Sequence, residues 1–72
     1  MEFNVTAGTR QYFSVVLDDE DDVRWTVNGN LLRYRENVTS DEFRYRADDL
    51  GWYNVTVTTT KSIYTWSMRV IR

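Results

Sequence analysis

Apolar and polar residues alternate with a period of two along most of this chain. Such alternation is typical of β-strands that bury one face and expose the other. No segment has the 3.6-residue period of an amphipathic helix. The pattern predicts about seven short strands, which lie near Phe3–Thr6, Phe13–Leu17, Val23–Val27, Leu31–Arg35, Phe43–Arg46, Tyr53–Thr58 and Tyr64–Val70.

The strongest turn signal is the pair Asn28-Gly29, which lies between two alternating segments. Both residue types tolerate a positive φ, as the tight turn of a two-residue hairpin requires. We therefore expect a hairpin that joins the strand around Trp25 to the strand at Leu31–Arg35.

Two polar segments are expected to be loops. The first is the run Asp18-Asp19-Glu20-Asp21-Asp22, in which five adjacent like charges repel one another and require water. The second covers residues 36–41. In this interpretation each segment ends one strand and separates it from the next.

The composition indicates one domain with an aromatic core. The 72 residues include three Trp, five Tyr and three Phe, but no Cys and no His. A chain of this length buries only about 60% of the surface that its unfolded form exposes, and no disulfide can compensate. We expect an all-β antiparallel sandwich over residues 1–72, held by side-chain packing alone.

Two motifs resemble those of immunoglobulin-like domains. Asp49-Leu50-Gly51-Trp52-Tyr53 resembles the D-x-G-x-Y corner that opens strand F, in which the Tyr hydroxyl bonds back to the backbone upstream. The segment Val23–Gly29 resembles strand C, where a buried Trp precedes a hairpin. Val55 stands where antibody domains have a Cys. We expect Trp25 to pack on Val55 and on either Phe13 or Val15.

The order of these motifs looks like immunoglobulin-like and PKD-like modules of archaeal or bacterial cell-surface proteins. The W-D-F-G-D-G motif of PKD modules is absent. The resemblance implies one module excised from a longer extracellular protein, with neighbouring domains of the same chain as its partners. It also implies a set of structural residues: Trp25, Gly29, Asp49, Gly51, Tyr53, Val55 and Trp66.

The residue inventory argues against an enzyme. Without His or Cys, the Ser-His-Asp and Cys-His arrangements are impossible. Paired carboxylates occur at Asp41-Glu42 and Asp48-Asp49, but a glycosidase must place two across a cleft, for which so small a domain has little room. There is no Gly-rich phosphate loop, so neither a cofactor nor a catalytic residue is expected.

Nucleic acid and membrane are unfavourable partners for this chain. Its net charge is −2, whereas nucleic-acid-binding domains are basic. Arg33-Tyr34-Arg35 and Arg44-Tyr45-Arg46 combine basic and aromatic residues, but the alternation predicts both Tyr side chains in the core and the Arg side chains outside. No stretch has the length of about 18–20 apolar residues that spans a bilayer.

The acidic run Asp18–Asp22 has two interpretations. Carboxylates are ligands for Ca²⁺, and a calcium ion at the end of a sandwich could stiffen an array of domains. The run lacks the spaced ligands and the Gly of a calcium loop, and isolated charge runs are usually solvated. We assign no metal ligands, and the solvated loop is the favoured interpretation.

Three N-x-T sequons and two outward aromatic residues bear on function. Asn4, Asn37 and Asn54 each begin a sequon and are expected at the surface, where an extracellular chain can be glycosylated. Tyr12 and Trp52 fall on outward positions.

The sequence therefore favours a non-catalytic structural module of a cell-surface or secreted protein. The alternative is an adhesion module that binds a surface glycan or protein through an exposed sheet face or polar loops.

Overall fold

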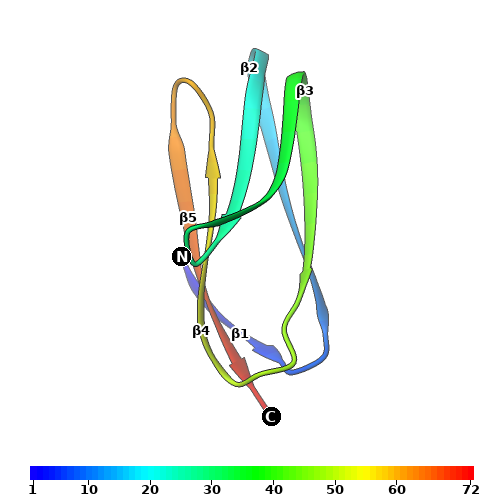
Figure 1. Cartoon of the computed structure of the whole chain (residues 1–72), viewed down its shortest axis with the longest axis vertical. Coiled ribbons are helices and arrows are strands. Elements are labelled where there is room, and N and C mark those ends of the chain that lie inside the picture. Colours follow the sequence, from blue (N-terminus) through cyan, green and yellow to red (C-terminus); the bar gives the residue numbers. More distant parts are fainter.

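The computed structural model describes residues 1–72 and contains strands but no helix. It accordingly has no helix long and apolar enough to cross a membrane. The five strands are β1 (Glu2–Thr6), β2 (Arg10–Val27), β3 (Asn30–Arg46), β4 (Gly51–Thr58) and β5 (Ile63–Ile71) (Figure 1).

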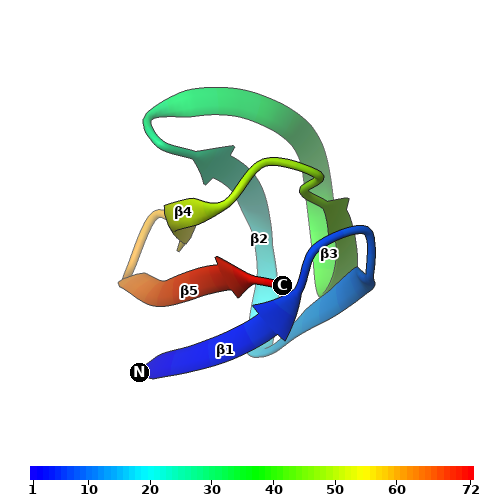
Figure 2. The same ribbon diagram turned by 90° about the horizontal axis from the view of Figure 1, so that it is seen from below.

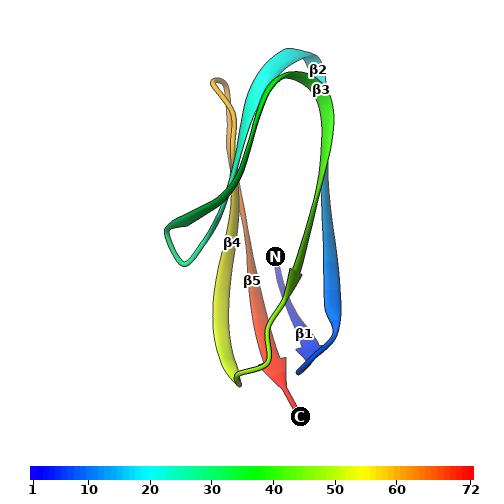
Figure 3. The same ribbon diagram turned by 45° about the vertical axis from the view of Figure 1, so that its right-hand side comes forward.

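All five strands belong to one sheet, in the order β1-β5-β4-β2-β3. The pairs β2–β3, β2–β4 and β4–β5 are antiparallel, whereas β1 runs parallel to β5. The β2–β3 hairpin bends over. Its lower half, residues 10–16 of β2 and 40–46 of β3, faces β4 and β5 across the core (Figure 3). The end-on view in Figure 2 shows the strands arranged around this core. The expected all-β class is confirmed, but the expectation of a wholly antiparallel fold is wrong.

The expectation of seven strands is also wrong, because both expected loops are extended segments inside long strands. The acidic run lies within β2, and residues 36–41 lie within β3. The ladder continues past both segments by an irregular register: Val16 pairs with Ser40 and Asp21 with Val38, so five steps on β2 match two on β3. An irregularity of this kind bends a strand without ending it, and the first three acids of the run, residues 18–20, remain exposed.

The core is apolar and has Trp25 at its centre. Trp25 is fully buried and stacks on Phe43 at 5.2 Å and on Trp66 at 6.0 Å between ring centroids. Phe13 packs against Trp66 at 5.2 Å. The expected burial of Trp25 is confirmed, but its aromatic neighbours lie on β3 and β5 and were not among those expected. Eleven buried residues form this core: Val5, Phe13, Val23, Trp25, Val27, Phe43, Ala47, Val55, Val57, Met68 and Val70.

The two Arg-Tyr-Arg segments do not orient alike. Tyr45 is half-buried against Phe43, as expected, but Tyr34 is exposed and lies under the guanidinium of Arg24 at 5.3 Å. The reason is the register: Tyr34 pairs with Arg24 and therefore shares its outward face, while Arg33 pairs with the buried Trp25. The expectation that Tyr34 points inward is wrong.

The Asn28-Gly29 hairpin forms at the tip of β2 and β3. Asn28 has φ 51° and Gly29 has φ 84°, the two positive values that a type I′ turn needs. Asn28 also docks this turn on β4, because its Oδ1 accepts the Asn54 N–H at 2.9 Å and its own N–H donates to Asn54 O at 2.9 Å.

Replacing Gly29 by Ala tests the demand for a positive φ in this turn. No atom lies within 4 Å of a Cβ added there, so the cost comes from the backbone conformation alone. We expect Gly29→Ala to lower the free energy of unfolding by about 1–2 kcal/mol, measured by urea denaturation. Ser40→Ala, at an exposed strand position, serves as the control. Equal stability of the two variants would show that the turn relaxes to negative φ.

Candidate functional site: the acidic bend and the outward sheet face

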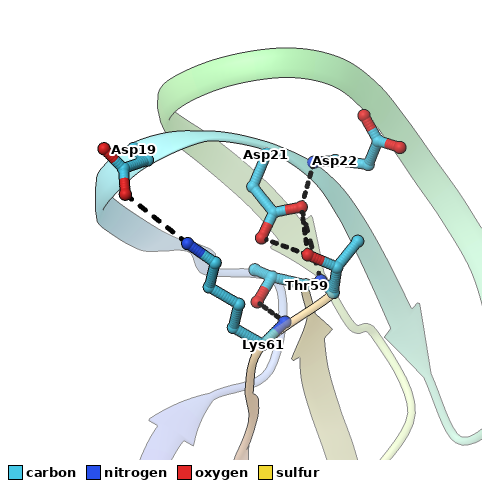
Figure 4. Close-up of polar contacts among 6 residues, drawn as sticks. Asp19, Asp21, Asp22, Thr59 and Lys61 are labelled. Atoms are coloured by element: carbon cyan, nitrogen blue, oxygen red, sulfur yellow. Dashed lines mark hydrogen bonds and ion pairs between the residues drawn. The ribbon is translucent and has the colours of Figure 1, made fainter.

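The bend of β2 is fastened to the turn between β4 and β5 by polar contacts (Figure 4). Thr60 Oγ1 donates to the Asp21 carboxylate at 2.8 Å, and Thr60 N approaches the same carboxylate at 3.4 Å. Lys61 Nζ lies 3.5 Å from Asp19 Oδ2. We call the contacts of Asp19 and Asp21 with Thr60 and Lys61 the latch, because they join segments about 40 residues apart in the chain.

The receiving side of the latch is a turn organised by Thr59. Its hydroxyl oxygen accepts the backbone N–H of Lys61 at 3.2 Å and of Ser62 at 3.0 Å. Its own N–H donates to Ser62 O at 2.9 Å. These bonds fix the turn backbone, which presents Thr60 and Lys61 toward β2.

Hydrogen bonding lowers the pKa of Asp21. The bond from the Thr60 side chain is the largest cause; burial opposes it, and the N–H of Asp22 adds to the lowering. A carboxyl group whose folded-state pKa lies below its unfolded value of about 3.9 stabilises the fold above that pH. Its contribution is lost as the pH falls through the folded-state pKa. The contact between Asp21 and Thr60 therefore weakens in acid.

The calcium interpretation of the acidic run receives no support from this geometry. The structure holds no group of three or more carboxylates placed to share a metal ion. Instead Asp21 is engaged by Thr60, and Asp22 Oδ1 accepts the backbone N–H of Asn37 at 3.2 Å. Asn37 has φ 54°, at the point where β3 passes the bend. The acidic run thus fastens the bend of β2 to two neighbouring segments, the turn between β4 and β5 and the strand β3.

A second polar cluster spans the bend from inside. Asp41 accepts the indole N–H of Trp25 at 2.9 Å and two hydrogen bonds from Arg33, at 3.0 and 2.9 Å. The Asp41 side chain is 7% exposed and that of Arg33 is 36% exposed. The Arg33 bonds, helped by Trp25 and opposed by burial, lower the pKa of Asp41. This role of Asp41 was not predicted from the sequence. The available signal was its position two residues before Phe43, which places both side chains on the same, inward side of the strand.

The corner motif has the geometry that the resemblance implies. Tyr53 Oη donates to the backbone oxygen of Asp49 at 2.9 Å. Burial, followed by the charge of Asp49, raises the pKa of the Tyr53 phenol. Gly51 has φ 137°, which favours glycine. Of the other residues in the expected structural set, Trp25 and Val55 are fully buried, Trp66 is partly buried, and Gly29 is exposed at the hairpin tip.

The outward face of β4 and β5 is mainly polar and carries one exposed indole. Trp52 is 55% exposed, and the guanidinium of Arg69 lies 5.8 Å from its ring centroid. The hydroxyls of Thr56 and Thr65 are 3.0 Å apart on the same face. Tyr12 is also exposed, but it lies on the lower half of β2, which does not pair with β4. The two outward aromatic residues therefore do not form one patch.

All three sequon asparagines are exposed. Asn4 lies on β1, Asn37 lies at the bend of β3, and Asn54 lies on β4. Of the three asparagine side chains, only that of Asn54 makes a hydrogen bond: its Oδ1 accepts from Ser67 Oγ at 3.3 Å. Each of the three side chains is therefore open to solvent.

Comparison with known proteins shows an immunoglobulin-like fold. Two crystal structures of the mouse leukocyte-associated immunoglobulin-like receptor 1 are similar, both described as strand-swapped dimers. The extracellular domain gives a TM-score of 0.74 at 17% identity, over 99% of this chain and 80% of that chain. The immunoglobulin-like domain gives 0.65 at 18% identity, over 99% and 88%. No family model matches the sequence, and no curated protein does.

Removing the Thr60 hydroxyl tests the latch. We expect Thr60→Ala to raise the pKa of Asp21 toward its ordinary value of about 3.9, because the largest cause of its lowering is removed. Thr60→Ser keeps the hydroxyl and should keep the low pKa. Carboxyl-carbon NMR during an acid titration measures all three proteins. An Asp21 pKa that is the same in the Ala and Ser variants would contradict the latch.

Proposed function

We propose that this chain is a non-catalytic structural module of a cell-surface or secreted protein, one that holds its neighbours apart and carries tension. The observation that carries the proposal is the parallel pairing of β1 with β5. The pairing runs from Glu2 opposite Ser67 to Thr6 opposite Ile71. Bonds of 2.7 Å close both of its ends, from Ser67 N to Met1 O and from Ala7 N to Ile71 O.

The direction of these strands determines how a pull on the two ends acts. A force on residue 1 draws β1 from its beginning, and a force on residue 72 draws β5 from its end. In a parallel pair the two strands then slide along each other, which loads all the hydrogen bonds between them together. An antiparallel pair pulled at adjacent ends opens one bond at a time. The first arrangement resists tension better because no bond is loaded alone.

Two further observations support an extracellular setting, and the elongated shape suits a spacer. The fold is similar to that of an extracellular receptor domain. The three sequon asparagines are exposed, as glycosylation requires. The molecule is elongated, 39 by 19 by 16 Å, with the C-terminus at one end and the N-terminus about halfway along (Figure 1). An archaeal or bacterial parent protein and a PKD-like kinship remain part of this proposal.

Adhesion through the outward face of β4 and β5 is the second candidate. The specific observation in its favour is the exposed indole of Trp52 beside Arg69 and a row of hydroxyl and amide groups. An aromatic ring bordered by such polar groups is the surface chemistry that carbohydrates and proteins recognise. The separation of Trp52 from Tyr12 places this candidate second.

Single-molecule pulling tests the proposed role. The chain has no Cys, so handles can be attached at introduced cysteines in one of two pairs of positions. We expect a higher unfolding force through residues 1 and 72 than through Arg10→Cys and Arg46→Cys, which are paired neighbours on β2 and β3. Ala7→Pro removes one terminal bond of the β1–β5 pair and should lower only the first force. Equal forces in both geometries would contradict a load-bearing role.

A further inference from the structure

Strand β3 is the last strand of the sheet and pairs only with β2. Its outer edge therefore presents unpaired backbone N–H and C=O groups along the lower half, residues 40–46. A surface hollow also lies on β3, and it is lined by Leu32, Arg33, Asp41, Glu42, Phe43 and Arg44. An open edge of this kind is a template for another strand unless its side chains oppose pairing.

The side chains of this edge are complementary to themselves. Glu42 and Arg44 are exposed and share the outward face, one on each side of the buried Phe43. When a second copy of residues 40–46 lies antiparallel with Phe43 opposite Phe43, Glu42 of each copy faces Arg44 of the other. Directly opposite charges of unlike sign stabilise a pair of strands.

The same charges disfavour the neighbouring registers. A pairing centred on Glu42 places two carboxylates opposite each other, and one centred on Arg44 places two guanidinium groups opposite each other. In the Phe43 register, by contrast, Arg46 faces Ser40 and Asp41 faces Tyr45. No like charges meet, so the charges of this edge favour the Phe43 register over those centred on Glu42 and Arg44.

We propose that two copies of this chain associate through residues 40–46 of β3, antiparallel and centred on Phe43. The lower halves of the two β2–β3 hairpins then form one continuous four-stranded layer in the order β2-β3-β3-β2. The interface is isologous, because the same residues of both copies meet about a two-fold axis. Its reciprocal Glu42–Arg44 pairs are exposed, so the association weakens as salt increases.

Charge reversal tests this interface in the intact chain. Glu42→Arg and Arg44→Glu each place like charges opposite one another in the dimer, whereas the double variant restores complementarity with the signs exchanged. Sedimentation velocity at low ionic strength measures the dissociation constant of the dimer. Circular dichroism verifies that each variant is folded.

We expect each single variant to raise the dissociation constant at least about tenfold, since two attractive pairs become repulsive. The double variant should return it close to that of the unmodified chain. An equimolar mixture of the two single variants should form a heterodimer, because positions 42 and 44 are both basic in one variant and both acidic in the other. On dilution of the unmodified chain, amide NMR shifts should be confined to residues 40–46 and their β2 partners.

Two results would overturn the proposal. An unmodified chain that remains monomeric up to about 1 mM would show that a second copy does not occupy this edge. Single variants that dimerise as well as the unmodified chain would show association through a different surface.

Discussion

A bent hairpin forms most of this fold, and the mostly buried carboxylate of Asp41 joins the two sides of its bend. Arg33 and Asp41 lie eight residues apart on β3, on opposite sides of its bend. Their two hydrogen bonds therefore close the bend from inside, and the bond from Trp25 to Asp41 joins the same point to the centre of the core. A carboxylate with 7% exposure is costly to desolvate, and strong bonds to it offset that cost only when its partners are well placed.

The other features of the molecule are arranged around this closure. The bend brings Phe43 against Trp25 and Phe13 against Trp66, so the aromatic core exists only while the hairpin is folded over. The latch from Asp21 to Thr60 fastens the same bend from outside. Folding the hairpin over also leaves the lower half of β3 as an open edge, and it leaves the parallel β1–β5 pair to connect the two ends of the chain.

The sequence predicts the strand content well because burial of one face imposes a period of two. It also predicts the turn at Gly29 and the contact of Tyr53 with Asp49, because both depend on neighbouring residues. It could not predict that the acidic run stays extended, since that depends on Thr60, 39 residues away. The sequence also predicted Tyr34 inside and Arg33 outside, whereas the structure has the reverse. The register shift in β2 that sets these faces leaves no signal in the sequence around Arg33 and Tyr34. Asp41 lies against the core only because of partners that the bend brings to it.

A double-mutant cycle between Arg33 and Asp41 tests the closure most directly. The free energy of unfolding would be measured near neutral pH for the unmodified chain, Arg33→Met, Asp41→Asn and the double variant. The account predicts a coupling energy of about 1 kcal/mol or more. Because the folded-state pKa of Asp41 is lowered, the coupling should persist down to its unfolded value of about 3.9 and vanish as the pH falls through the folded-state pKa. A neutral-pH coupling of zero within about 0.3 kcal/mol would contradict the claim that this pair holds the hairpin closed.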